Sequence, residues 1–436
     1  MTTDRETLLR VVERRVSGEL ARLPDPEGAE NRRWYWAAPF LLDALQLGDA
    51  QDEFLEVMAG WGDHDPDDKE SQQVLHIRRA QELRVEDLGA RPSDLPTVLA
   101  MMALAGPGVT ALRALSRACG GPAALDDVDV RNYASYVSWG LRSLFNRPES
   151  TAVVRAGDDH EPYWQAVLRH CFDGNLQAVL DEFVHTLVDS EGLQDTDSTA
   201  RAAALSNVME EALTLRATTA TVDTVEVTGR SAHLTTHRVR GHFAARFGRG
   251  QDEENQAQRE SHVRIAFNSP FWPFVLASMS VGQEGLDFHP YSHAVVHWNL
   301  PGNPVDLEQR EGRVHRFKGH AVRRNVALTH GTAALAEGAD PWNSMFAAVQ
   351  NDCAEGNDLT PFWVYSPEGG VLIERYVPVA PLSREAVRYA RLLRTVGAYR
   401  LVMGQPRQED LLRYLGNDVA ALNWLRIDLT PSPERT

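Results

Sequence analysis

The stretch that decides the fold runs from Phe267 to Arg324 and reads FNSPFWPFVLASMSVGQEGLDFHPYSHAVVHWNLPGNPVDLEQREGRVHRFKGHAVRR. Within it the short apolar run Phe274–Met279 is typical of a buried strand, and it leads into a turn with two glycines and the carboxylate of Asp287. Ala294–Trp298 reads as a second buried strand. This order predicts one edge of an open α/β sheet, where ligands bind at the carboxyl ends of the strands.

A helix with a well-marked start follows the second strand. Asn303 can cap it, and Pro304 suits the first helical position, where no amide hydrogen is needed. We expect this helix to continue to Gly319, which supplies a stop. One stripe of such a helix is polar and faces away from its packed side. The polar stripe consists of Gln309, Arg313 and Arg316. The packed side consists of Leu307 and Val314.

The polar stripe contains the pattern Q-x-x-G-R-x-x-R, in which Gly312 precedes the first arginine. Two guanidinium groups about a turn apart, beside a glycine that lets another backbone come close, suit a dispersed negative charge such as a transferring phosphoryl group. The alternative is a solvated charged helix face, which is the common explanation for an arginine-rich helix. The strands and the glycine turn upstream favour the phosphoryl interpretation.

Two segments of this stretch resemble a known family. SVGQEGLDFH is similar to motif V, and QREGRVHR to motif VI, of superfamily 2 helicases and translocases, closest to the branch with chromatin remodellers and bacterial polymerase-recycling ATPases. The resemblance covers roughly Ala217–His330, the second RecA-like lobe. It implies an α/β fold, a RecA-like parallel-sheet lobe behind a large helical region. Near-total use of Arg over Lys fits a GC-rich bacterial genome.

The resemblance also implies roles for individual residues. Arg313 and Arg316 would face the γ-phosphate of ATP, and Gln309 would link the nucleotide to the interface between lobes. The motif glycines and carboxylate that accompany them near the nucleotide are Gly285, Asp287 and Gly312. Ser278 and Ser280 match positions at which the family contacts the nucleic-acid backbone.

One half of the motor is missing from this sequence. A first lobe needs G-x-x-x-x-G-K followed by Ser or Thr to hold the phosphates, and a D-E-x-x motif to hold Mg²⁺. The only lysines are Lys69 and Lys318, and neither stands in that pattern. Asp52-Glu53 and Asp181-Glu182 imitate the second motif, but each lies in a helical pattern. We therefore expect ATP and Mg²⁺ to bind only in complex with a separate chain that carries the first lobe, and the reading frame to start after that lobe.

Residues 1–215 have the apolar periodicity of helices almost throughout, which resembles an insertion between the two lobes in some bacterial relatives. We expect a helical region at 1–215, the RecA-like lobe at 216–332 and an α+β extension at 333–436. The expected helices are Leu8–Leu20, Trp34–Leu47, Ser71–Leu83, Leu95–Leu104, Ala111–Cys119, Val130–Phe145, Trp164–Cys171, Leu176–Leu187 and Ala200–Leu215. Their aromatic residues favour core packing over a base-stacking platform. These are Trp34, Tyr35, Trp36, Tyr133, Tyr136 and Trp139.

The formal net charge is −17, which is unfavourable for a nucleic-acid partner if it is evenly spread. Between Arg230 and Arg324, however, thirteen Arg or Lys face nine Asp or Glu, a local net charge of +4. We expect duplex DNA as the partner of this basic part. Scattered cysteines argue against disulfides, and an amphipathic start without a long apolar run argues for the cytoplasm and against a membrane.

Two further strands are expected upstream, Val222–Val227 and Leu234–Phe247. Arg238 and Arg240 on the second strand either follow phosphates or form the wet side of a half-exposed strand. His289, His293 and His297 recur every fourth residue, but a proline and a strand break the helical geometry that a metal site would need. We expect His315 to make a hydrogen bond at an interface.

Farther along we expect a returning strand at Val326–Thr329, a pair of strands from TPFWVYS and VLIERYV around the turn PEGG, and helices at Arg384–Met403 and Gln408–Leu415. The favoured hypothesis is the second lobe of a nucleic-acid-dependent ATPase. Its rival is an inactive lobe that binds nucleic acid or a protein.

Overall fold

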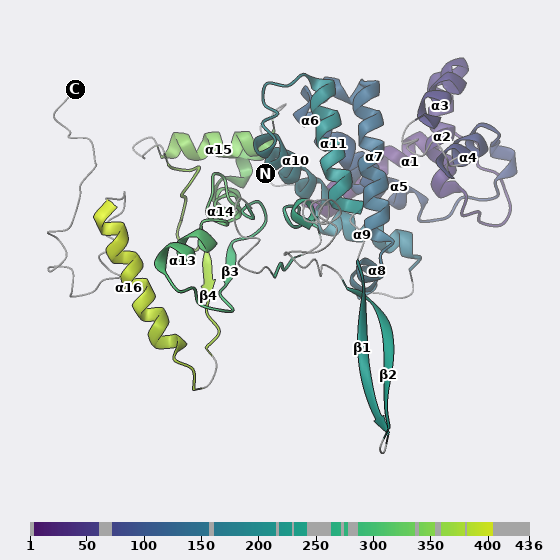
Figure 1. The fold of residues 1–436 in the computed structure, drawn as a ribbon. Helices are drawn as coiled ribbons and strands as arrows, with labels where there is room; N and C mark the ends of the chain where they lie inside the picture. Colours follow the sequence, from purple (N-terminus) through teal and green to yellow (C-terminus); the bar gives the residue numbers. More distant parts are fainter. Residues whose placement is uncertain are drawn as a thin grey trace. The chain divides into compact units, whose positions relative to one another are not determined.

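The computed structural model describes residues 4–60, 72–156, 161–214, 218–228, 231–241, 263–271, 274–277, 287–335, 340–353, 359–379 and 382–403 (Figure 1). Contacts divide the chain into two compact units. The first, here the helical unit, comprises Met1–Arg246, Gly250–Leu276 and Thr332–Met345. The second, here the motif unit, comprises Phe247–Arg249, Ala277–Gly331 and Phe346–Thr436.

The helical unit confirms the predicted helical region, and each of the nine predicted helices is present with small shifts at its ends. Two further helices were not among those predicted. They are α3, which contains the helical pattern around Asp52-Glu53, and α8, which begins at Pro148, a residue tolerated at a first helical position. The helices are α1 (Arg5–Leu20), α2 (Trp34–Leu47), α3 (Gln51–Ala59), α4 (Gln72–Gln81), α5 (Leu95–Ala105), α6 (Pro107–Ala118), α7 (Val128–Phe145), α8 (Pro148–Arg155), α9 (Tyr163–Asp173), α10 (Leu176–Ser190) and α11 (Ser198–Thr214).

The centre of this unit is the packing of α6, α7, α10 and α11. Asp127 starts α7 by accepting hydrogen bonds from the backbone amides of Asp129 and Val130. Gly140 allows α7 to approach α11, because a Cβ there would lie 2.8 Å from the side chain of Leu213. The leucines that fill the space between the helices are almost fully buried. They are Leu115, Leu141, Leu180, Leu205 and Leu213.

The aromatic residues of the helical unit serve the core, as predicted. Trp34 is fully buried, donates from Nε1 to the carbonyl oxygen of Gly89 at 2.8 Å and lies under the guanidinium of Arg91. The other five are half-buried. A ring platform for stacked bases would need exposed faces, so these positions favour packing.

One stretch in the described part of the chain, Leu95–Ala118, is long and apolar enough to cross a membrane by length and composition. It is not one helix but two, because α5 ends before Gly106 and α6 begins at Pro107. Half of the most apolar 18-residue part of this stretch is buried inside the structure. Core helices of this kind pass the same test.

The predicted strands before and after residue 230 form an antiparallel ribbon (Figure 1). β1 (Thr218–Thr228) pairs with β2 (Ser231–Gly241) from Thr218 opposite Gly241 to Thr228 opposite Ser231. The part of the second prediction beyond residue 241 lies outside the described residues. In this register Arg238 stands opposite Thr221, and Arg240 opposite Thr219.

The motif unit contains a small parallel sheet of β3 (Ala294–Val296) and β4 (Glu374–Tyr376). The expected pairing of β4 with TPFWVYS is wrong. Backbone carbonyls of that segment instead accept hydrogen bonds from other groups, Phe362 from the amide of Lys318 and Tyr365 from the side chain of Asn325.

Helices lie between β3 and β4 and after β4 along the chain. They are α13 (Pro304–Glu311), α14 (His320–His330), α15 (Pro341–Asp352) and α16 (Glu385–Met403). The last confirms the helix predicted from Arg384, and the helix predicted from Gln408 lies outside the described residues. The returning strand at Val326–Thr329 is wrong, because Ala321, Val322 and Val326 are buried at the spacing of a helix.

The predicted buried strands of the opening stretch need correction too. The described residues of Phe274–Met279 form no strand, and Phe274 and Val275 are 69% and 82% exposed. Ala294–Trp298 does contain β3, but Val296 and Trp298 are exposed. The apolar pattern therefore predicted a strand correctly at Ala294–Trp298 but not at Phe274–Met279. In both segments the predicted burial was wrong.

Candidate functional site

The predicted start of α13 is confirmed in detail. Asn303 lies in the extended region and its Oδ1 accepts a hydrogen bond from the amide of Asp306 at 2.8 Å, with Pro304 at the first helical position. Leu307 is 1% exposed and packs against Leu300 and the α16 residues Leu392 and Val396. The helix is therefore fixed by a local cap and by a tertiary contact.

The predicted end of this helix is wrong. α13 stops at Glu311, and Gly312 caps it, so Arg313 and Arg316 lie beyond the helix and share no helical stripe with Gln309. The carbonyl of Arg313 accepts the amide of Phe288 at 3.0 Å instead of an amide one turn farther on. Competition from this tertiary hydrogen bond, together with the low helix propensity of glycine, explains the early stop.

The segment after α13 is joined to the last residues of motif V. Besides the Phe288 to Arg313 bond, the amide of His320 donates to the carbonyl of His289 at 2.9 Å. Arg316 Nε lies 3.1 Å from Asp287 Oδ1. The structure thus brings together two predicted site residues that are 29 positions apart in the printed sequence.

The ion pair between Arg316 and Asp287 is open to solvent. Their side chains are 48% and 52% exposed. An exposed pair of this kind contributes at most about 1 kcal/mol, so a more highly charged anion can compete for the guanidinium. Because the guanidinium of Arg316 is half-exposed, an anion can approach it from the solvent.

The remaining predicted residues differ in how well they are placed. Gln309 is exposed on α13, Gly312 is its cap and Arg313 is half-buried. Val314, expected on a packed side, is 5% exposed. Arg238 and Arg240 belong to β2. The residues that lie outside the described part of the chain are Ser278, Ser280 and Gly285.

A cavity of about 190 Å³ lies beside Arg316 within the motif unit. Its polar wall includes His315, Tyr365 and Ser366. Its apolar wall includes residues from both ends of the 363–373 segment. His315 Nε2 lies 3.3 Å from the carbonyl oxygen of Trp363, which agrees with the hydrogen-bonding role expected for this histidine. The cavity makes Arg316 the edge of a concave surface.

Among the residues that the structure describes, the histidines near motif V belong to no group of three or more His, Cys, Asp or Glu that could hold a metal ion. His293 and His320 face each other instead, with their Nδ1 atoms 3.0 Å apart. Burial lowers the pKa of His320 to about 3 and that of His289 to about 4, so both are neutral near pH 7.

Sequence reasoning missed a buried polar cluster at the end of α13. Glu311 accepts two hydrogen bonds from the guanidinium of Arg375 and lies 3.1 Å from Nε2 of His297, while Arg375 also donates to Tyr389 at 3.3 Å. Burial alone would raise the pKa of Glu311, but the hydrogen bonds from His297 and Arg375 hold it below its usual value. No local pattern announces partners that lie up to 64 residues away.

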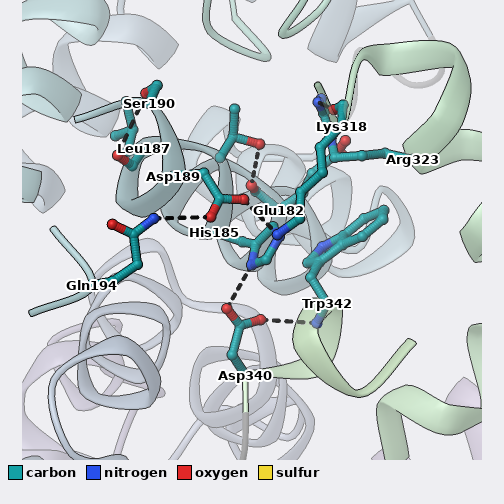
Figure 2. Close-up of polar contacts among 11 residues, drawn as sticks. Glu182, His185, Leu187, Asp189, Ser190, Gln194, Lys318, Arg323, Asp340 and Trp342 are labelled. Atoms are coloured by element: carbon teal, nitrogen blue, oxygen red, sulfur yellow. Dashed lines mark hydrogen bonds and ion pairs between the residues drawn. The ribbon is translucent and has the colours of Figure 1, made fainter. Parts of the chain in front are cut away.

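A second buried cluster lies in the helical unit (Figure 2). His185 on α10 is 3% exposed, with Nδ1 2.7 Å from Asp340 and Nε2 3.4 Å from Asp189. Asp340 also accepts the amide of Trp342 at 2.8 Å. Burial alone would raise the pKa of Asp340, but the contact with His185 and the hydrogen bonds from the amides of Trp342 and Asn343 together hold it below its usual value. The cluster ties the start of α15 to α10.

The acidic pairs that imitate a magnesium motif have structural surroundings. Asp181 on α10 pairs with Arg117 and accepts a hydrogen bond from Gln177, and burial raises its pKa to about 6. Asp52 and Glu53 lie in the first turn of α3. Neither pair follows a strand, as expected.

Comparison with known families now identifies the segment around the site. Residues 208–318, about a quarter of the chain, match the helicase conserved C-terminal domain. The match supports a helicase C-terminal lobe. It implies a RecA-like fold, nucleotide binding and interaction with nucleic acid in general terms. No curated protein and no solved structure matches this chain.

Proposed function

We propose that this chain is the second motor lobe of a nucleic-acid-dependent ATPase of superfamily 2, and that it supplies Arg313 and Arg316 to an ATP site completed by another chain. The observation that carries the proposal is the pair of Asp287 and Arg316, 3.1 Å apart and half-exposed inside the helicase-matched segment. It brings a motif V residue and a motif VI residue together, which supports a shared nucleotide edge.

The residues fit one side of a nucleotide site. The guanidinium of Arg316 is half-exposed and so accessible to an anion, and Arg313 stands three residues earlier, directly after the helix cap. Developing negative charge on a phosphoryl group is what such guanidiniums stabilise. The ATP and Mg²⁺ would be held mainly by the first lobe, because no Walker-type lysine occurs in this sequence.

The nucleic-acid side of the proposal rests on charge and on the ribbon. The sequence from Arg230 to Arg324 has a net charge of +4, in a chain of net charge −17. Arg238 and Arg240 stand two residues apart on β2, opposite Thr221 and Thr219 of β1. We propose duplex DNA as the ligand, with Ser278 and Ser280 as further backbone contacts, in the cytoplasm of a bacterium.

The rival function is an inactive lobe that binds nucleic acid or a protein without turnover. The observation in its favour is the sequence itself, which lacks the phosphate-holding lysine. Both hypotheses predict DNA binding. Only the motor hypothesis predicts that a first-lobe chain restores ATP hydrolysis.

The test is ATP hydrolysis by the purified chain, alone and mixed with the product of a neighbouring reading frame that carries a Walker A lobe. We expect no hydrolysis by the chain alone, with or without DNA, and hydrolysis by the mixture that depends on DNA. Helicase-like hydrolysis by the chain alone would contradict the shared site. A mixture that binds but stays inactive would favour the rival.

A further inference from the structure

The carboxylate of Glu311 stands at the point where α13 ends. Glu311 is the last residue of the helix, and Gly312 and Arg313 follow at once. The direction in which the chain leaves α13 therefore decides where the guanidinium of Arg313 lies. A contact that holds Glu311 also holds this exit.

Residues of two elements outside α13 contact this carboxylate, and a residue of a third contacts its arginine partner. Arg375 of β4 contributes Nε and Nη2, one to each oxygen of Glu311, which is a bidentate pair. His297, directly after β3, contributes Nε2 at 3.1 Å. Tyr389 of α16 accepts from Arg375 Nη1 at 3.3 Å and orients the guanidinium.

The cluster is shielded from water. The side chain of Glu311 is 18% exposed, that of Arg375 is 25% exposed and that of His297 is fully buried. Hydrogen bonds hold the carboxyl of Glu311 ionised, and the pKa of Arg375 is raised above its ordinary value by the same contact, against the effect of burial. Removing one partner would leave the other charge buried and uncompensated.

We propose that Arg375 is a positioning residue for Arg313, which acts by clamping Glu311 at the end of α13. Arg375 lies 57 positions beyond the last residue of the helicase match. The segment with β4 and α16 is then a working part of the motif VI region and not a separate appendage. The consequence for catalysis rests on the proposed function, whereas the clamp itself does not.

The clamp differs from ordinary packing in its dependence on geometry. Lysine keeps the charge of Arg375 but cannot make two parallel hydrogen bonds to one carboxylate. We therefore expect Arg375→Lys to keep only part of the clamp. Glu311→Gln should lose it as fully as removal of the Arg375 side chain does. A purely structural role for β4 would instead loosen the whole unit together.

Amide hydrogen exchange of the full chain, read by mass spectrometry without ATP or DNA, tests the clamp. In Arg375→Ala we expect exchange at residues 312–316 to rise by about ten-fold or more, and exchange at α14 residues 325–329 to change by less than about two-fold. Arg375→Lys should give an intermediate rise. Arg391→Ala, a change of an exposed arginine on α16, should give none.

A double-mutant comparison closes the test. In a Glu311→Gln background, Arg375→Lys should have little further effect on residues 312–316, because the contact is already broken. Equal acceleration in α14 and in 312–316, no acceleration at all, or full additivity of the two changes would each overturn the proposal. If Arg375→Ala does not fold, the pair of Glu311→Gln and Arg375→Lys still decides. Since no nucleotide is used, failure here is separate from failure of the motor function.

Discussion

Two arginine–carboxylate pairs lie on either side of Gly312, and they differ in what surrounds them. Arg375 and Glu311 are 25% and 18% exposed and make two hydrogen bonds to each other. Arg316 and Asp287 are 48% and 52% exposed, with Arg316 Nε 3.1 Å from Asp287 Oδ1. A shielded bidentate pair fixes the backbone, whereas a solvent-exposed pair can be exchanged for a ligand. In our proposal, the pair of Arg375 and Glu311 thus holds the backbone in place, and Arg316 takes part in the chemistry.

The largest effect is expected on the open side. In an active complex with a first-lobe chain, Arg316→Ala should lower the rate of ATP hydrolysis by roughly 10³- to 10⁵-fold, because it removes charge stabilisation of the transferring phosphoryl group. Unfolding free energy of the isolated chain should change by no more than about 0.5 kcal/mol. Single-turnover hydrolysis and denaturant unfolding measure the two quantities.

A matched control for this experiment is Arg324→Ala, which removes an exposed arginine from α14. It should leave turnover near the wild-type rate. Normal turnover in Arg316→Ala would break the comparison, since the open pair would then be only a surface ion pair. Arg313→Ala is expected to lower turnover as well, but with some loss of stability, because Arg313 is half-buried.

The opposite pattern is expected on the shielded side. Glu311→Gln should lower the unfolding free energy near pH 7 by about 2 kcal/mol, which is less than the roughly 3–5 kcal/mol for a broken buried pair because the partners are partly exposed. The folded-state pKa of Glu311 lies below the ordinary value of 4.5, so its stabilisation is complete above that value and is lost as the pH falls through the folded pKa. Denaturant unfolding of both proteins at several pH values should show their difference shrinking below about pH 4.5.

A structural feature of this chain could be predicted from the sequence where residues close together in the sequence determine it, and not where distant residues do. The helices of the helical unit and the start of α13 follow from short patterns, such as Asn303 before Pro304, and these were confirmed. The end of α13 depends on the amide of Phe288, and the partner of β4 depends on β3, about 80 residues earlier. Sequence periodicity reports only on local structure and not on such distant contacts. The predicted helical stripe of Gln309, Arg313 and Arg316 and the predicted strand pair around the turn PEGG were therefore wrong.

The candidate site divides in the same way. Residue types and spacing pointed to Asp287 and Arg316, and the structure joins them. Nothing in the sequence near Glu311 pointed to Arg375, because a charged residue beside a motif is indistinguishable from a solvated one until its partner folds against it. The residues that we propose to organise the candidate site were therefore harder to find than those that match the motifs.

The buried cluster of the helical unit extends the comparison to a second shielded pair. Asp340→Asn should lower the unfolding free energy by about 1–3 kcal/mol, because it weakens a hydrogen bond to a histidine that is 3% exposed. Asp195→Asn, at an exposed position, is the control. Equal stability of the two variants in denaturant unfolding would show that burial does not separate structural from exchangeable pairs here.

The ribbon offers arginines whose expected partner is outside the protein. Replacing Arg238 and Arg240 together with alanine should weaken duplex DNA binding by about ten-fold at low salt and reduce the slope of log affinity against log salt by about 2. Fluorescence anisotropy over a salt series measures both. The double change of Arg14 and Arg15 to alanine on α1 is the control. An unchanged slope would favour the wet side of a strand as the role of these arginines.

The smallest expected effect is on stability and concerns the other member of the open pair. Asp287→Asn keeps the size of the side chain and removes its charge, so the unfolding free energy should change by less than about 1 kcal/mol, as for other exposed ion pairs. Added salt should shrink even this difference, because screening acts on exposed charges. Denaturant unfolding at low and high salt, beside Glu311→Gln under the same conditions, gives the direct contrast. If Asp287→Asn cost as much as Glu311→Gln, the contact with Arg316 would be a structural clamp too, and a phosphate could not displace it without unfolding the segment that presents both arginines.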